Sequence, residues 1–249
     1  PKDVILEVLG RIRADGAVYK AIDFTGSYVE KLNVAGRMTI CNMAVEMGAK
    51  TAYMQPNADV LNYVDKRAVR PYEVQFTDPD FQYEESYVFD VSKIEPNLAC
   101  PSSVENVHPL SEVVANGPIK LNQGYIGSCT GGRVEDIAIA AKILKGRHIP
   151  EYTRLIVVPA SNEVMQECMK AGYIQDLMNA GATITTPGCG ACLGAHEGIL
   201  APGEVCITST NRNFPGRMGS TEALMYLASP ATVAASMVNG CITDPREFL

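Results

Sequence analysis

The sequence predicts an α/β protein of two domains, each built on an open sheet, and three observations support this fold class. The 249 residues exceed the roughly 100–200 of a typical single domain. Short apolar runs alternate with longer segments of helical periodicity, most clearly in the second half. Gly-rich turns separate several of these runs from the helical segments, as in βα units. We place the domains at residues 1–91 and 92–249, because Pro96 and Pro101 bracket a stretch without periodicity.

The first domain has a mixed pattern of helices and short strands. Its helices are predicted from apolar residues that recur three and four positions apart, and its last helix follows Asn57, a residue type that caps helix N-termini. Several prolines and tyrosines near its end predict extended edge segments in long loops. The expected elements are helices over Val4–Ala14, Val34–Met47 and Ala58–Lys66, a strand over Thr51–Gln55, and extended segments within Val69–Asp90.

The second domain alternates strand and helix. Its apolar runs have the length of buried parallel strands and precede turns and helical segments, and ligands of such sheets bind at the carboxyl ends of the strands. The expected strands are Ile119–Ile126, Leu155–Pro159, Ala182–Thr186 and Val205–Thr210, and the expected helices are Arg133–Lys145, Asn162–Asn179 and Ala231–Asn239.

Composition excludes several classes of protein. The net charge is −7 without a basic cluster, which argues against nucleic acid as a partner. No apolar run approaches the ~18–20 residues of a membrane span, and the first residues do not resemble a signal peptide. Eight cysteines in 249 residues are too few for a disulfide scaffold. We therefore expect a cytoplasmic protein without membrane contact, whose thiols are free to bind metal or to pack in the core.

Three turns after predicted strands share a composition rich in glycine. They are GSCTGG at 127–132, PGCGACLG at 187–194 and NRNFPGRMG at 211–219. Cys129, Cys189 and Cys192 lie in the first two turns, where glycine allows the backbone to approach a bound cluster closely. A cubane held by only three thiolates leaves one iron open for water or substrate, and that iron is a Lewis acid.

Two other kinds of site also fit these cysteines. An isolated Cys-x-x-Cys pair is more often a redox pair, half of a zinc site or a coincidence. An electron-transfer cluster needs a fourth thiolate, and the nearest candidate in sequence, Cys206, lies in an apolar strand-like run. A zinc-stabilised interaction domain needs a further Cys or His to complete a tetrahedron. The residues alone leave both alternatives open.

The third turn contributes two arginines. Arg212 and Arg217 flank Phe214–Gly216, and a guanidinium group binds a carboxylate through two parallel hydrogen bonds. A single arginine of this kind is more often a surface ion-pair partner. Two of them in one Gly- and Pro-containing turn after a strand indicate a carboxylate ligand.

These motifs together resemble the aconitase superfamily. The resemblance rests on the three turns and on the segment RMTICNMAVEMGA at 37–49, and it covers the chain from Pro1 to Leu249. The sequence is most similar to the large subunit of the two-subunit 3-isopropylmalate dehydratases and their homoaconitase relatives. In these relatives a further N-terminal domain precedes the position of Pro1, so we expect the chain to be a C-terminal portion of such a subunit.

The resemblance implies two aconitase-type α/β domains and a role for each motif residue. By this resemblance, Asn42 and Glu46 would approach the cluster from the first domain, and Glu46 would exchange protons with the hydroxyl group or water that moves. Without the resemblance, these two residues would be read as a solvated helix face. Relatives commonly have Asn at the position of Gly131. The implied ligands of a [4Fe–4S] cluster are Cys129, Cys189 and Cys192, with Asn211 near the cluster and Arg212 and Arg217 on the substrate carboxylates.

The implied reaction moves a hydroxyl group between adjacent carbons of a 2-hydroxy di- or tricarboxylate by dehydration and rehydration. Interconversion of 3-isopropylmalate and 2-isopropylmalate, a step of leucine biosynthesis, is the commonest activity of such relatives. Homoaconitase and 2,3-dimethylmalate dehydratase are the alternatives. The resemblance also implies a separate small subunit that supplies the base, a serine, and the loop that reads the substrate. We therefore expect this chain alone to be an inactive part of a hydro-lyase.

Overall fold

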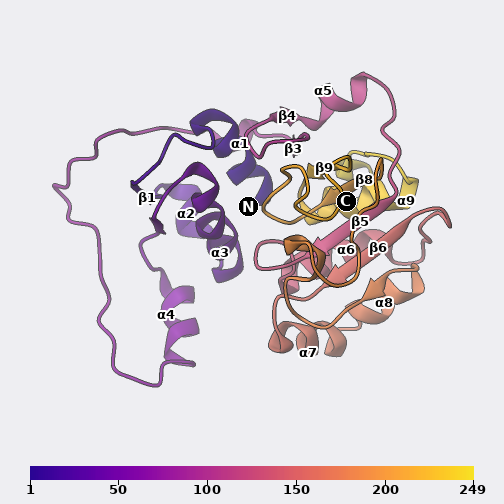
Figure 1. The fold of residues 1–249 in the computed structure, drawn as a ribbon. Helices are drawn as coiled ribbons and strands as arrows, with labels where there is room; N and C mark the ends of the chain where they lie inside the picture. Colours follow the sequence, from indigo (N-terminus) through magenta and orange to yellow (C-terminus); the bar gives the residue numbers. More distant parts are fainter.

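The structure, a computed structural model, describes residues 1–249 and contains two sheets. A two-stranded parallel sheet lies in residues 1–93, called the first half below. A seven-stranded sheet lies in residues 94–249, called the second half, as Figure 1 shows. This confirms the predicted α/β fold class. The division at residue 91 stays a prediction. None of the helices combines the length and the apolar character that a membrane span requires.

The first half packs four helices around its small sheet. Asn57 caps α4 as predicted, because its side chain accepts a hydrogen bond from the Val60 amide. Residues 68–90 form a long irregular segment on the outer side of the molecule, without the expected edge strands (Figure 1). The elements are α1 (Lys2–Ile12), β1 (Ala21–Asp23), α2 (Ser27–Lys31), α3 (Val34–Met43), a 3₁₀ turn (Ala44–Met47), β2 (Thr51–Tyr53), α4 (Ala58–Asp65) and a second 3₁₀ turn (Val91–Lys93).

The helix predicted over Val34–Met47 divides in two. Its α-helical part ends at Met43 and a tighter 3₁₀ turn follows. Arg37 anchors the α-helical part, because its buried guanidinium group donates to the carbonyl oxygens of Leu32, Gln55 and Val29 at 3.0, 2.8 and 2.7 Å. The segment that carries Asn42 and Glu46 therefore has a fixed position on the small sheet.

The second half forms a mixed seven-stranded sheet. Its strand order is β4-β3-β9-β8-β5-β6-β7, in which the last five are parallel and β3 and β4 pair antiparallel at one edge. The elements are β3 (Asn97–Ala99), β4 (Val107–Pro109), α5 (Leu110–Ala115), β5 (Gln123–Gly127), α6 (Val134–Leu144), β6 (Arg154–Val158), α7 (Asn162–Lys170), α8 (Tyr173–Asn179), β7 (Thr183–Ile184), a 3₁₀ turn (Gly190–Leu193), β8 (Val205–Thr208), β9 (Leu224–Leu227), α9 (Pro230–Asn239) and a 3₁₀ turn (Pro245–Phe248).

One sequence prediction about this half was wrong, and three short strands were not predicted. The stretch 91–101 contains β3, whose three residues are too few to show the period of a strand. The helix expected over 162–179 is two helices, because Gly172 adopts a left-handed conformation with φ 81° between them. Strands β4 and β9 were not predicted.

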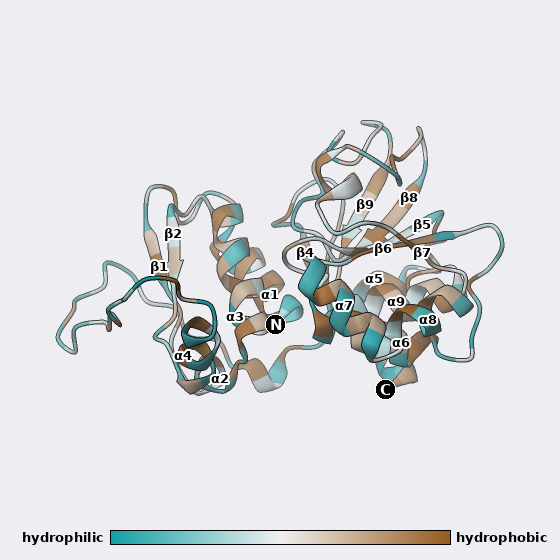
Figure 2. Cartoon of the chain, turned by 90° about the horizontal axis from the view of Figure 1, so that it is seen from below, coloured by the Kyte–Doolittle hydropathy of each residue, from teal (hydrophilic) through white to brown (hydrophobic).

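The two faces of the large sheet have different covers. Alternate residues of a strand point to opposite faces, so Ile126 and Val157 belong to the core under the helices, whereas Tyr125 and Ile156 belong to a smaller core on the other side. Helices α6 to α9 all lie on one face, and irregular chain covers the other (Figure 2). The predicted Gly-rich turns lie in or beside this irregular cover.

The chain reverses its direction of travel across the sheet between β5 and β8. Strands β5, β6 and β7 follow one another toward one edge, and β8 and β9 then extend the sheet from the other side of β5. Ligands of open α/β sheets bind at the carboxyl ends of the strands at such a switch point. The GSCTGG turn follows β5 and the NRNF turn follows β8, so two of the three predicted motifs lie there.

The two halves share a hydrophobic core. The core cluster built on α1 and α3 also contains Ala99, Val104 and Leu227 from the second half. Helix α1 packs against β3 and β4. This contact brings α3 and its 3₁₀ extension to the switch-point edge of the large sheet.

Candidate functional site

The turn after β5 presents Cys129 at the surface, next to a strained residue. Ser128 adopts φ 67°, and its hydroxyl is buried without a hydrogen-bond partner. A non-glycine residue in this region of φ is uncommon and often marks a functional site. The amide nitrogen of Asn211 lies 3.8 Å from the Cys129 sulfur, and the Thr130 hydroxyl donates to the Asn211 side-chain oxygen. The turns after β5 and β8 therefore meet at Cys129.

Cys189 directly precedes the short 3₁₀ turn over Gly190–Leu193 that contains Cys192, in the irregular cover of the sheet. The Cys192 amide donates to the Cys189 carbonyl at 3.0 Å, and Gly190 between them has φ 52°. Tyr125 of β5 donates its hydroxyl to the same carbonyl at 2.8 Å. The side chain of Cys189 is exposed and that of Cys192 is buried. The strand that precedes Cys129 thus also anchors the other cysteine turn.

Glu46 and Arg212 form an ion pair across the two halves of the chain. The Arg212 Nε donates to both Glu46 carboxylate oxygens, at 2.8 and 2.9 Å. The Glu46 side chain is only 8% exposed, so burial raises its pKa, while Arg212, Lys2 and Arg217 act in the opposite direction. The reading of Glu46 as part of a solvated helix face is therefore wrong.

Asn42 also reaches the second half. Its side-chain amide donates to the Cys129 carbonyl oxygen at 3.5 Å, the long end of the hydrogen-bond range. One turn earlier on α3, the Thr39 hydroxyl donates to the Thr130 carbonyl at 3.4 Å. Asn42 and Glu46 thus contact the turns after β5 and β8, respectively.

Arg217 keeps its charge unpaired. Its Nε is buried without a partner, and its guanidinium carbon lies 5.7 Å from the centre of the Phe214 ring. The Arg217 carbonyl lies against Gly194, where an added Cβ would approach it to 3.1 Å. Arg217 therefore contacts the end of the cysteine turn and has a free cationic group, as a carboxylate-binding residue requires.

Gly131 leaves no room for a side chain. An added Cβ would lie 2.2 Å from the Ser209 Oγ and 2.6 Å from the Ser209 carbonyl oxygen. Ser209 itself accepts a hydrogen bond from the Gly127 amide and donates to the Gly131 carbonyl. The close approach of the β5 and β8 turns accounts for glycine at this position.

The alternatives to a three-thiolate cluster gain no support from the structure. Cys206 lies inside β8 and is fully buried, and burial raises the pKa of its thiol to about 12. No three His, Cys, Asp or Glu side chains lie close enough together to hold a single metal ion, as a zinc site requires.

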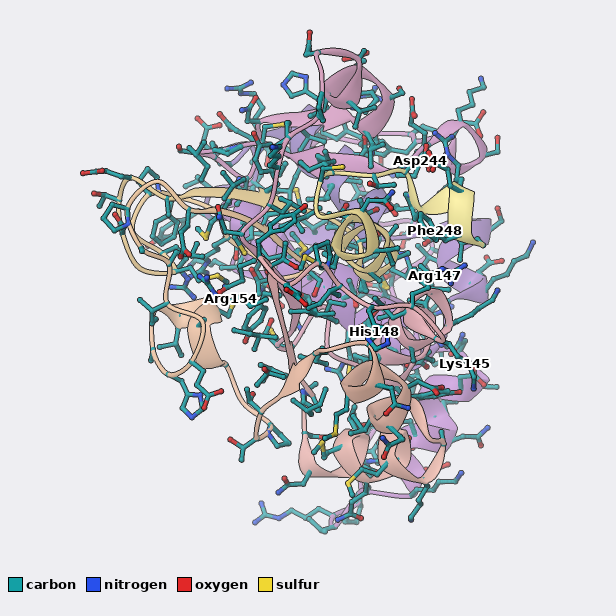
Figure 3. The ribbon with its side chains drawn as sticks, turned by 90° about the vertical axis from the view of Figure 1, so that its right-hand side faces the viewer. Lys145, Arg147, His148, Arg154, Asp244 and Phe248 are labelled. Atoms are coloured by element: carbon teal, nitrogen blue, oxygen red, sulfur yellow. The ribbon has the colours of Figure 1, made fainter.

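The three histidines contribute no contact to this site. His148 lies beside Lys145 beyond the end of α6, on the face that Figure 3 shows, at the amino edge of the parallel strands. His108 is exposed and contacts Asn106, and His196 is exposed with φ 68°. None was predicted to be catalytic.

The residues present fit a [4Fe–4S] cluster. Three free thiols stand in turns with left-handed backbone positions, two of them exposed, and the orphaned Ser128 hydroxyl lies next to one of them. Cluster sulfides accept hydrogen bonds from such turns, and thiolates are the cluster's usual ligands. The assignment of each ligand stays a prediction.

Lys2 is a site neighbour that the sequence did not reveal. It is 2% exposed, and its ammonium group donates to the carbonyl oxygens of Ser209 and Thr210 at the end of β8. A lysine in the first turn of an amphipathic helix is ordinarily solvated, so no local signal marks it. Only the packing of α1 against the large sheet brings it there.

The fold and these side chains define a class: an open α/β protein whose thiol, amide and guanidinium groups gather at the carboxyl ends of parallel strands. The chain belongs to the aconitase family (aconitate hydratase), whose sequence profile matches residues 1–240.

Two relatives illustrate the family match. The sequence is 51% identical over its full length to the 3-isopropylmalate dehydratase large subunit 1 of Methanopyrus kandleri, covering 59% of that protein. It is 49% identical over 99% of its length to the "Probable methanogen homoaconitase large subunit" of Methanothermobacter thermautotrophicus, covering 57% of it. The chain thus spans less than two thirds of the length of these curated relatives.

Proposed function

We propose that the chain is part of the large subunit of a hydro-lyase that interconverts hydroxy di- or tricarboxylates with a [4Fe–4S] cluster. The observation that carries the proposal is the meeting of Cys129, Asn211 and the Glu46–Arg212 pair at the switch point of the sheet. The family profile supports the same reaction class. The free thiols support a reducing, cytoplasmic location.

The three cysteines would hold the cluster, which supplies a Lewis acid when bound. Arg217, which has no partner, binds one substrate carboxylate through its guanidinium fork. Arg212 offers its two terminal nitrogens to a second carboxylate while its Nε stays on Glu46. Two clamped carboxylates fix the carbon whose proton is lost, which lowers the entropic cost of reaction.

Glu46 is the proton-handling group of this chain. Burial raises the pKa of its carboxyl group and so favours the protonated form, while Arg212 holds the group in place, so the side chain can exchange a proton with a hydroxyl group or water at the site. Asn42 and Asn211 orient the surrounding turn. No side chain of this set is a strong base for a carbon-bound proton, and the term "large subunit" in the relatives' names supports a small subunit as its source.

We propose 3-isopropylmalate as the substrate and homocitrate as the second candidate, because relatives of nearly equal identity carry the two names. The test assembles the whole polypeptide with its small subunit under anaerobic conditions, after reconstitution with iron and sulfide. Rates on isopropylmalate, homocitrate, citrate and dimethylmalate are then compared. A kcat/KM for isopropylmalate more than ~10-fold below that for another substrate, about 1.4 kcal/mol, would reject the first choice.

A further inference from the structure

Lys2 buries a charge without a carboxylate partner. Its ammonium group donates to the carbonyl oxygens of Ser209 at 3.0 Å and Thr210 at 2.5 Å, and it lies 3.2 Å from the Met43 sulfur. No ion pair includes it. An ammonium group removed from water at this depth is costly unless its surroundings compensate. The contacts of Lys2 must therefore compensate for this cost.

The partners of Lys2 connect the two halves of the site. Ser209 and Thr210 directly precede Asn211 and Arg212 in the turn after β8, and Met43 follows Asn42 in α3. The Lys2 ammonium thus touches both the turn that carries the arginine and the helix that leads to Glu46. Two carbonyl dipoles directed at one cation hold that turn in a single conformation.

Four titratable groups from other elements face Lys2. They are Asp136 of α6, Cys192 of the 3₁₀ turn, Cys129 after β5 and Glu46 after α3. Burial lowers the pKa of Lys2 to about 8, and these four groups act against that decrease. The side chain is therefore a cation at neutral pH, close to two of the three cysteines.

We propose that Lys2 is a positioning residue that holds the Ser209–Arg212 turn against α3 and keeps a positive charge beside the anionic three-cysteine site. The second part rests on the proposed function, since it requires a cluster. A cluster with three thiolates is negatively charged, and its reduction potential depends on nearby charge and on solvent exposure. A buried ammonium group close to it favours the reduced form.

The test compares Lys2→Met, a neutral side chain of similar length, with Lys2→Arg, which keeps the charge. Lys142→Met, an exposed lysine on α6, is the matched control. The whole polypeptide is reconstituted anaerobically and the cluster is titrated with reductant while its electron paramagnetic resonance signal is followed. We expect a lower midpoint potential in Lys2→Met and a value near wild type in Lys2→Arg and in the control. An unchanged potential in a fully loaded Lys2→Met protein would overturn the charge role.

Hydrogen exchange in the cluster-free protein tests the positioning role separately. Amides of residues 210–213 should exchange at least ~10-fold faster in Lys2→Met than in the Lys142→Met control, while amides of α9 stay unchanged. Equal exchange in the turn would overturn this role, whether or not the variant binds a cluster. If wild-type protein binds no iron and sulfide, the proposed function fails, and the exchange experiment still decides the positioning role.

Discussion

The face of the large sheet that packs on helices buries a core of 24 hydrophobic residues, whereas the core on the opposite face contains nine. Regular helices cover the first face, and turns with left-handed residues cover the second. Turns have backbone amides that are free to bind a ligand, whereas the amides of a helix form hydrogen bonds within the helix. The larger stabilising core and the candidate site therefore lie on opposite sides of the same strands.

The largest expected effect comes from the helical face. Leu144→Ala in α6 removes a fully buried side chain and should cost about 3–5 kcal/mol of unfolding free energy. The matched variant Leu200→Ala, on the irregular face, should cost less, because the turns around it can close part of the cavity. Urea unfolding of the cluster-free protein measures both. Equal losses of unfolding free energy in the two variants would contradict the expected difference between the faces.

The second effect separates chemistry from stability. Cys189→Ala deletes an exposed thiol, so the unfolding free energy of the cluster-free protein should hardly change. In the whole polypeptide, reconstituted and assembled with its small subunit, the proposed activity should fall about 100-fold or more. Cys168→Ala, at a buried position of α7, is the control: it should retain iron and lose about 1 kcal/mol of unfolding free energy. Iron content and urea unfolding report the two properties. Full iron retention in Cys189→Ala would exclude it as a ligand.

The third effect is a pH dependence of the unfolding free energy, which comes from Asp136 at the start of α6. Burial raises the pKa of Asp136, in the first turn of α6, to about 6. Because the folded-state pKa exceeds the unfolded one, this group's contribution to stability is complete below about pH 4 and is lost as the pH rises through 6. The loss is at most about 2–3 kcal/mol.

Asp136→Asn isolates this contribution. Asparagine keeps an oxygen for the Arg133 amide that Asp136 now accepts from, and it does not titrate. Unfolding free energies of both proteins are measured from pH 4 to 7. The difference between them should change by about 2 kcal/mol across this range. A constant difference would show that Asp136 does not titrate there.

The smallest effect tests how tightly the two turns of the site approach each other. Gly131→Ala places a Cβ against the Ser209 backbone and should cost at least about 1 kcal/mol. Gly146→Ala, at a glycine with open space around it but φ 73°, is a control for conformational strain alone. Thermal unfolding gives both values. A neutral Gly131→Ala would mean that the turns after β5 and β8 separate easily.

The sequence alone determined the fold class and the motif residues. Periodicity located α1, α4, α6 and α9 to within a few residues, because each has a polar and an apolar side or a capping residue that acts locally. Glycine and cysteine in strand-end turns marked the site, since those residue types have few other reasons to occur together. Strands of two to four residues gave weaker signals, and β3, β4 and β9 escaped notice.

Only the tertiary structure decided which side chains meet. The partners Glu46 and Arg212 are 166 residues apart, and Lys2 and Ser209 are 207 apart. No local pattern encodes such pairs, because they depend on how α1 packs against the edge of the large sheet. Strand order likewise follows from long-range pairing, and it alone places the turns after β5 and β8 next to each other. Local sequence motifs therefore determine which residue types the site contains, and the packing of the two halves determines how those residues are arranged.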